Sequence, residues 1–117
     1  MCGIFGIVAQ HEQALGPILI DAGRRLSYRG YDTVGCATLH EHGGIDLRKD
    51  VGKVDAVAER LSFEEMTGRR GILQLRWATF GAPSQVNAQP HLDDDVAAFG
   101  HRSRRRQAAK RAVFHFR

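Results

Sequence analysis

The first nine residues read MCGIFGIVA, in which Met1 and Cys2 precede a short apolar run. Residues 4–9 predict a buried first strand, because the run is continuous, apolar and too short for a helix. Gly3 and Gly6 would let neighbouring backbone approach this strand closely. Cys2 thus stands at the head of a strand, which positions a reactive group better than a mobile tail does.

The rest of the pattern predicts a mixed α/β layer protein. Apolar residues recur at helical spacing in two segments, and Pro17 suits the first turn of the earlier one. The predicted helices span 16–27 and 53–61, the predicted strands 34–39, 45–49, 71–77 and the stretch from 96 to 99, and the predicted loops or turns 28–32, 42–44, 78–83 and 87–91.

Composition excludes several classes of protein. Among 117 residues, 43% are hydrophobic and 26% charged, which is typical of a globular chain and not of a disordered one. No apolar run approaches the roughly 18 residues of a membrane span, so no membrane association is expected. Two cysteines are too few for a disulfide framework, and no pair has zinc-ligand spacing, so no metal or other cofactor is expected. The cytoplasm is the expected compartment.

The net charge of +4 comes from the end of the chain. Residues 101–117 contain seven basic side chains and no acidic one, whereas residues 1–100 carry 10 basic against 13 acidic side chains. An arginine-rich tail can contact phosphates without specificity. No aromatic residue interleaves with the arginines before Phe114, so a solvated tail is favoured over nucleic-acid binding.

Cys2 is the candidate nucleophile. Removal of Met1 would leave a thiol and an α-amino group on one residue, with ordinary pKa values near 8.5 and 8. The amine can then accept the thiol proton, directly or through water, which is the N-terminal nucleophile arrangement. Downstream, Arg76 offers a planar fork for an α-carboxylate, Trp77 could wall a small pocket, and Thr79 supplies a hydroxyl. These four residues are the predicted site.

Five motifs occur in one order along residues 1–98. This set resembles the class II glutamine amidotransferases, and within them the glutaminase domain of glutamine–fructose-6-phosphate aminotransferases. The motifs are Met1-Cys2-Gly3-Ile4, Tyr28-Arg29-Gly30-Tyr31-Asp32, Gly52-Lys53-Val54, Arg76-Trp77-Ala78-Thr79 with Gly81, and Asn87-Ala88 with Pro90-His91.

The resemblance implies an N-terminal nucleophile fold, a four-layer α/β/β/α sandwich that is incomplete here. It implies that Cys2 attacks the side-chain amide of L-glutamine, forms a thioester and releases ammonia and then glutamate. It assigns Arg76, Trp77 and Thr79 to glutamine binding, and it places the loop at 28–32 beside the site. Ammonia transfer to fructose-6-phosphate would need a sugar-phosphate isomerase domain or a separate chain.

The sequence also departs from the family pattern. Gln74 and Leu75 replace a histidine and a hydroxyl residue before the Arg-Trp pair, and Gln89 replaces another histidine. The family's Asn-Gly oxyanion pair is absent, and residues 99–117 form the basic tail instead. A frameshift or truncated reading near residue 97 would explain this change, and a divergent tail is the alternative. A catalytically inactive fragment or binding module is therefore the rival interpretation of the whole chain.

Overall fold

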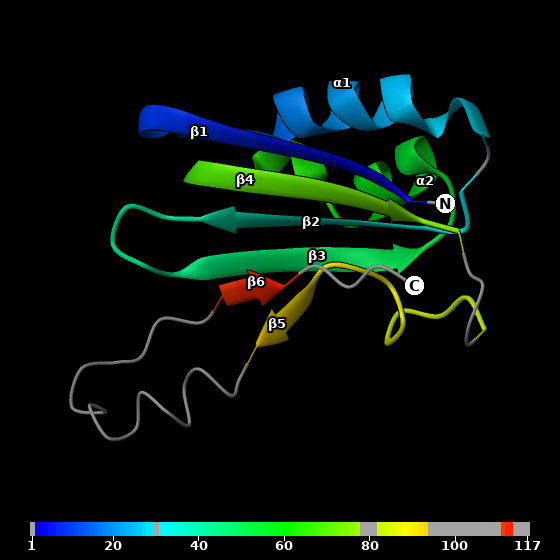
Figure 1. The fold of residues 1–117 in the computed structure, drawn as a ribbon. Helices are drawn as coiled ribbons and strands as arrows, with labels where there is room; N and C mark the ends of the chain where they lie inside the picture. Colours follow the sequence, from blue (N-terminus) through cyan, green and yellow to red (C-terminus); the bar gives the residue numbers. More distant parts are fainter. Residues whose placement is uncertain (1, 30, 78–81, 94–110, 114–117) are drawn as a thin grey trace.

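The structure is a computed structural model that describes residues 2–29, 31–77, 82–93 and 111–113. Strands and helices alternate in the order expected of a mixed α/β chain (Figure 1). The strands are β1 (Gly3–Ala14), β2 (Thr33–Leu39), β3 (Ile45–Val51), β4 (Thr67–Arg76), β5 (His91–Asp93) and β6 (Arg111–Val113), and the helices are α1 (Gly16–Leu26) and α2 (Val54–Arg60), with 3-10 turns η1 (Ser27–Arg29) and η2 (Phe63–Glu65).

The first four strands form one antiparallel sheet in the order β1-β4-β2-β3. β2 and β3 are a hairpin, and β4 enters between β1 and β2. The start of the chain and the end of β4 are therefore neighbours, with Gly3 paired to Leu75. A register shift marks a β-bulge between Val8 and Gln13, beyond which β1 pairs with β4 again, with Gln13 opposite Gly68.

The two helices cover one face of this sheet, as Figure 1 shows. Leu73 of β4 and Cys36 of β2 are fully buried there, together with Leu19 of α1 and Val57 of α2. Each fully buried aliphatic side chain of this kind stabilises the fold by roughly 1.5–3 kcal/mol. This helix-covered face is therefore the hydrophobic core of the described residues.

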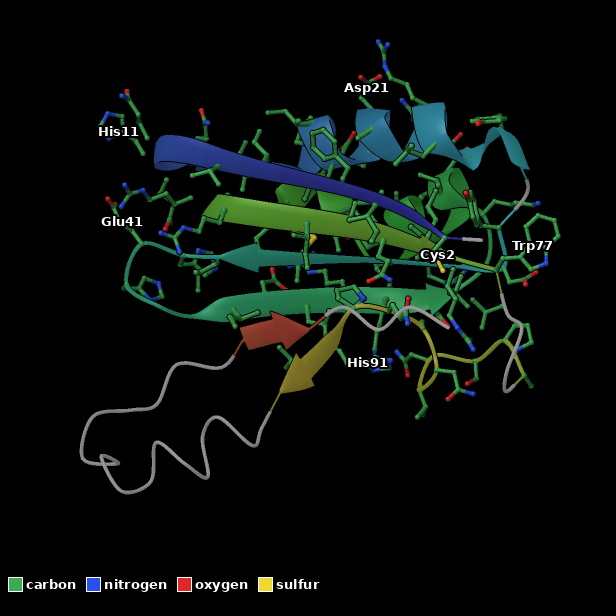
Figure 2. All side chains as sticks on the ribbon, viewed as in Figure 1. Cys2, His11, Asp21, Glu41, Trp77 and His91 are labelled. Atoms are coloured by element: carbon green, nitrogen blue, oxygen red, sulfur yellow. The ribbon has the colours of Figure 1, made fainter. Side chains whose placement is uncertain are left out.

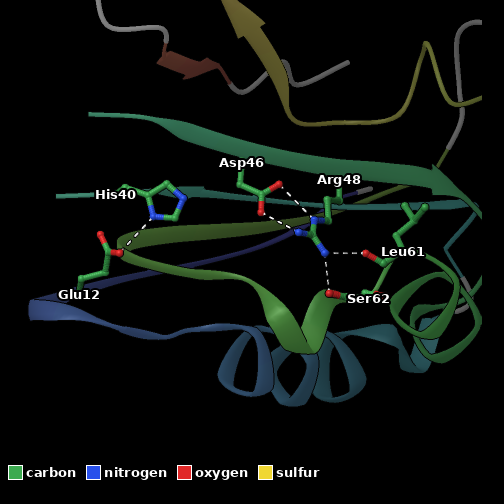
Figure 3. A network of polar contacts seen from close by, with 6 residues as sticks. All are labelled: Glu12, His40, Asp46, Arg48, Leu61 and Ser62. Atoms are coloured by element: carbon green, nitrogen blue, oxygen red, sulfur yellow. Dashed lines mark hydrogen bonds and ion pairs between the residues drawn. The ribbon is translucent and has the colours of Figure 1, made fainter. Parts of the chain in front are cut away.

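An arginine ties the edge strand β3 to the helical layer (Figure 3). Arg48 pairs with Asp46 at 3.0 Å and donates to the carbonyl oxygens of Leu61 and Ser62 at 2.9 and 2.7 Å. Those carbonyls lie just after α2, where helix-end oxygens lack helical partners. The guanidinium therefore supplies hydrogen-bond donors to the carbonyl oxygens between α2 and η2 and holds this part of the chain against the sheet.

The opposite face of the sheet carries the segment 82–93, whose strand β5 pairs with β6 (Figure 1). Side chains of β1 on this face remain accessible, with Ile4 37% and Val8 74% exposed. We call this surface the open face. In a strand, side chains alternate between faces, so Ile4, Gly6 and Val8 of β1 share the open face with the even-numbered residues of β4 that they pair with.

The α/β class predicted from the sequence is confirmed, as are both helices and four of the predicted strands. β1 and β4 are longer than predicted. The predicted strands stopped where polar residues such as His11 and Arg70 interrupt the apolar runs, whereas the pairing between β1 and β4 continues past them. β5 begins inside a predicted loop, and β6 lies within the predicted tail. The strand predicted at 96–99 lies outside the described residues. Among the helices described, none is both long and apolar enough to cross a membrane.

Candidate functional site

Cys2 and Arg76 come together at one end of the open face. Gly3 pairs with Leu75 and Thr33 pairs with Arg76, so the register places Cys2, Arg76 and Thr33 in one row across β1, β4 and β2. Cys2 is half-buried at the head of β1, close to the end of β4 in Figure 2. Two residues 74 positions apart in sequence thus share a surface because β4 inserts beside β1.

The Arg76 side chain is unusual because it is cationic yet only 7% exposed. Charged side chains are rarely buried to this extent, since leaving water costs several kcal/mol unless partners compensate. The backbone at Arg76 is held by the Asp32 amide, which donates to the Arg76 carbonyl oxygen at 3.0 Å. A buried guanidinium in the same row as a thiol suits recognition of a small anionic group.

Trp77 and the loop before β2 lie at the same end of the sheet. The Trp77 ring meets the Tyr31 ring edge-on, with centroids 6.3 Å apart and planes at 81°. Tyr31 is buried, and a side chain placed at Gly3 would lie 3.5 Å from its hydroxyl oxygen. Tyr31 of this loop therefore packs against the head of β1, while Trp77 stays 43% exposed.

A second row of residues lies next to the first. Gly35 pairs with Gln74 on one side and with Lys49 on the other, so β4, β2 and β3 each contribute one residue. All three face the segment 88–91. Gln74 Nε2 donates to Gln89 Oε1, and Lys49 Nζ donates to the Ala88 carbonyl oxygen at 2.7 Å. Lys49 also contacts His91 Nδ1 at 3.2 Å, so that nitrogen is the acceptor.

Gly35 is the point at which the segment touches the sheet. A Cβ at this position would lie 2.1 Å from the Gln89 carbonyl oxygen and 2.9 Å from Pro90 Cδ. Only glycine leaves room for backbone to approach a strand so closely. The segment therefore forms a fixed wall beside the row that contains Cys2 and Arg76.

Burial distinguishes the two cysteines. Cys36 is fully buried in the core, and burial raises the pKa of its thiol far above the ordinary value. A thiol that stays protonated is a poor nucleophile. Cys2 is the accessible thiol of the described chain, which supports its selection over Cys36. Burial also lowers the pKa of Lys49, although the ammonium keeps its two acceptors.

The structure describes three of the four predicted site residues. It brings Cys2 and Arg76 together and places Trp77 directly after them, while Thr79 lies outside the described residues. The sequence did not identify Thr33 or Lys49 as site residues, and Gln74 was noted only as a departure from the family pattern. The side-chain oxygens Thr33 Oγ1 and Gln74 Oε1 are buried without a hydrogen-bond partner in the part of the chain that the structure describes. Within those ranges no three His, Cys, Asp or Glu residues are arranged to hold a metal ion.

Comparison with curated proteins gives consistent relatives. The chain is 47% identical over 97 residues to glutamine–fructose-6-phosphate aminotransferase [isomerizing] of Mesorhizobium japonicum, a match that covers 83% of this chain and 16% of that protein. The Pseudomonas aeruginosa aminotransferase of the same name is 45% identical over 101 residues, covering 86% of this chain and 16% of its own. The chain thus spans about a sixth of the length of these relatives. No family model matches it.

A solved structure supports the same conclusion. Glutamine phosphoribosylpyrophosphate amidotransferase from B. subtilis superposes with a TM-score of 0.64 at 25% identity, covering 80% of this chain and 19% of that one. This chain is a relative of the class II glutamine amidotransferases. The resemblance read from the five motifs is confirmed, and the antiparallel sheet with its helical layer is the fold that the amidotransferase relationship predicts.

Proposed function

We propose that this amidotransferase relative carries out the glutaminase half-reaction, in which L-glutamine is hydrolysed to glutamate and ammonia through a thioester on Cys2. The observation that carries the proposal is the register that sets Cys2 beside Arg76. A thiol next to a buried guanidinium matches a substrate that has an electrophilic amide at one end and a carboxylate at the other. The proposal places this activity in residues 1–98 and leaves residues 99–117 outside it.

The chemistry begins with loss of Met1, which makes the α-amine of Cys2 available. The amine accepts the thiol proton, and the thiolate attacks the side-chain amide carbon of glutamine. The tetrahedral intermediate collapses as the α-ammonium returns the proton to the leaving nitrogen, so ammonia departs and a thioester remains. Water then cleaves the thioester, which yields glutamate and regenerates the thiol.

Arg76 holds the substrate in this scheme. Its guanidinium forms two parallel bonds with the α-carboxylate, which fixes both the distance and the orientation of the substrate. The buried position of Arg76 strengthens the contact because less water competes for it. Trp77 and Thr79 complete the proposed glutamine pocket. Delivery of the ammonia to a sugar phosphate would require an isomerase domain or another chain.

Glutamate release by the chain and its variants tests this function. Cys2→Ala is expected to abolish turnover, and Arg76→Gln is expected to lower kcat/KM roughly 10- to 100-fold, because hydrogen bonds to charged groups contribute about 1.5–3 kcal/mol. Arg70→Gln is the matched control, since Arg70 lies on the same strand and face but is exposed. Equal losses in the Arg76 and Arg70 variants would refute the carboxylate clamp.

A further inference from the structure

The row formed by Gln74, Gly35 and Lys49 has no part in the chemistry above, yet it holds the segment 88–91 against the open face. Each residue comes from a different strand, and all three contact the segment 88–91. Gln74 is fully buried and Gln89 is 4% exposed. Burying two amide side chains is unfavourable unless they bond to each other, so the pair fixes its two segments with specific geometry.

We propose that Gln74 is a positioning residue for the glutamine site and acts through Gln89. Gln74 lies two residues before Arg76 on β4 and on the same face. Its amide fixes Gln89, and the Gln89 backbone rests on Gly35 in the row next to Cys2. The segment 88–91 is thereby held as one wall of the space in which glutamine binds. This inference rests on the proposed function of that site.

Lys49 supports the same wall from the other side. Its ammonium reaches the Ala88 carbonyl oxygen and His91 Nδ1, one on each side of the Gln89–Pro90 pair. Residues 88–91 are therefore held by the charged Lys49 on β3 and by the neutral Gln74 amide on β4. Of the three residues in this row, Gln74 is the nearest to Arg76 along β4. Substituting Gln74 should therefore disturb the placement of the substrate more than the accessibility of the Cys2 thiol.

The test uses the full chain and two reagents for Cys2. A glutamine-analogue electrophile reacts only after it occupies the pocket, whereas iodoacetamide needs only an accessible thiol. Gln74→Leu is expected to slow the analogue roughly 10-fold, the effect of losing a buried hydrogen bond, and to leave the iodoacetamide rate unchanged. Gln74→His, whose ring N–H can still donate to Gln89, is expected to restore the rate. Gln10→Leu is the matched control because Gln10 is exposed on β1.

A double-variant cycle separates indirect from direct action. If Gln74 works through Gln89, then Gln74→Leu, Gln89→Leu and the double variant should all slow the analogue to the same degree. Multiplied losses in the double variant would overturn the inference, because they would mean that Gln74 acts on the substrate independently.

Hydrogen exchange provides a readout that does not depend on glutamine chemistry. In Gln74→Leu the peptide covering 88–92 is expected to exchange at least several-fold faster, while β2 keeps its protection. Unchanged exchange there would overturn the inference. If the wild-type chain shows no glutamine-protected labelling, the proposed function fails, and the exchange result still decides whether Gln74 positions the segment.

Discussion

Gly35→Ala is the substitution that most sharply tests how the segment 88–91 is held. The new methyl carbon would lie 2.1 Å from the Gln89 carbonyl oxygen and 2.8 Å from Lys49 Cβ. Contacts of this length do not occur between unstrained atoms, and the first involves backbone, so the segment must leave the sheet. It then loses the bonds from Lys49 and Gln74.

The size of the effect follows from those bonds. One hydrogen bond from a charged donor contributes about 1.5–3 kcal/mol and one neutral amide bond about 1 kcal/mol, so the free energy of unfolding of the variant should fall by about 2.5–4 kcal/mol. Urea unfolding followed by circular dichroism measures the difference. Gly6→Ala is the control, because a Cβ there meets nothing closer than 3.9 Å on the same face. Equal stability of the two variants would refute the packing described for Gly35.

Three further predictions concern the core and the titrating groups. Leu73→Ala should lower the free energy of unfolding by about 2–5 kcal/mol, whereas exposed Val8→Ala should change it by less than about 0.5 kcal/mol in the same urea titration. Burial raises the pKa of the Cys36 thiol, so only the unfolded chain ionises this thiol above about pH 8.5. The free energy of unfolding should therefore be unaffected by Cys36 at neutral pH and fall as the pH rises above about 8.5. Cys36→Ala should remove that decline between about pH 8 and 10. The Glu12 carboxylate accepts a hydrogen bond from the Glu41 amide, and this bond, with His40 nearby, lowers the Glu12 pKa. The bond should therefore be present above the ordinary carboxyl pKa and be lost as the pH falls through the lowered value. The NMR resonance of the Glu41 amide should follow this titration, and in Glu12→Gln it should no longer respond to pH in this range.

Much of the fold could be predicted from the sequence because its elements are locally encoded. Helical spacing of apolar residues located α1 and α2, and a Gly-rich turn located the β2–β3 hairpin. The far end of β1 and the start of β4 were missed, since two strands can remain paired where their side chains become polar. Strand order depends on contacts distant in sequence, and no local pattern shows that β4 separates β1 from β2.

The candidate site could be predicted only in part for the same reason. Cys2 and Arg76 were identified by their chemistry, but only the register shows that they are neighbours. Lys49 sits in a short alternating strand and looks like an ordinary surface lysine. Its contact with Ala88 crosses 39 positions and could not be read from spacing. Gln74 and Gln89 each stood out as departures from the family pattern, and only the structure shows that they bond to each other.

Cys2 is proposed to react with glutamine in a pocket formed with Arg76. The most direct measurement incubates the Met1-processed chain with a glutamine-analogue electrophile and locates the modified residue by mass spectrometry, with Cys2→Ala as control. This assay stops at the covalent step, so its outcome does not depend on hydrolysis of the thioester. We expect stoichiometric modification of Cys2 that excess glutamine blocks and that Arg76→Gln slows. Absence of labelling, equal labelling of Cys36, or no protection by glutamine would contradict it.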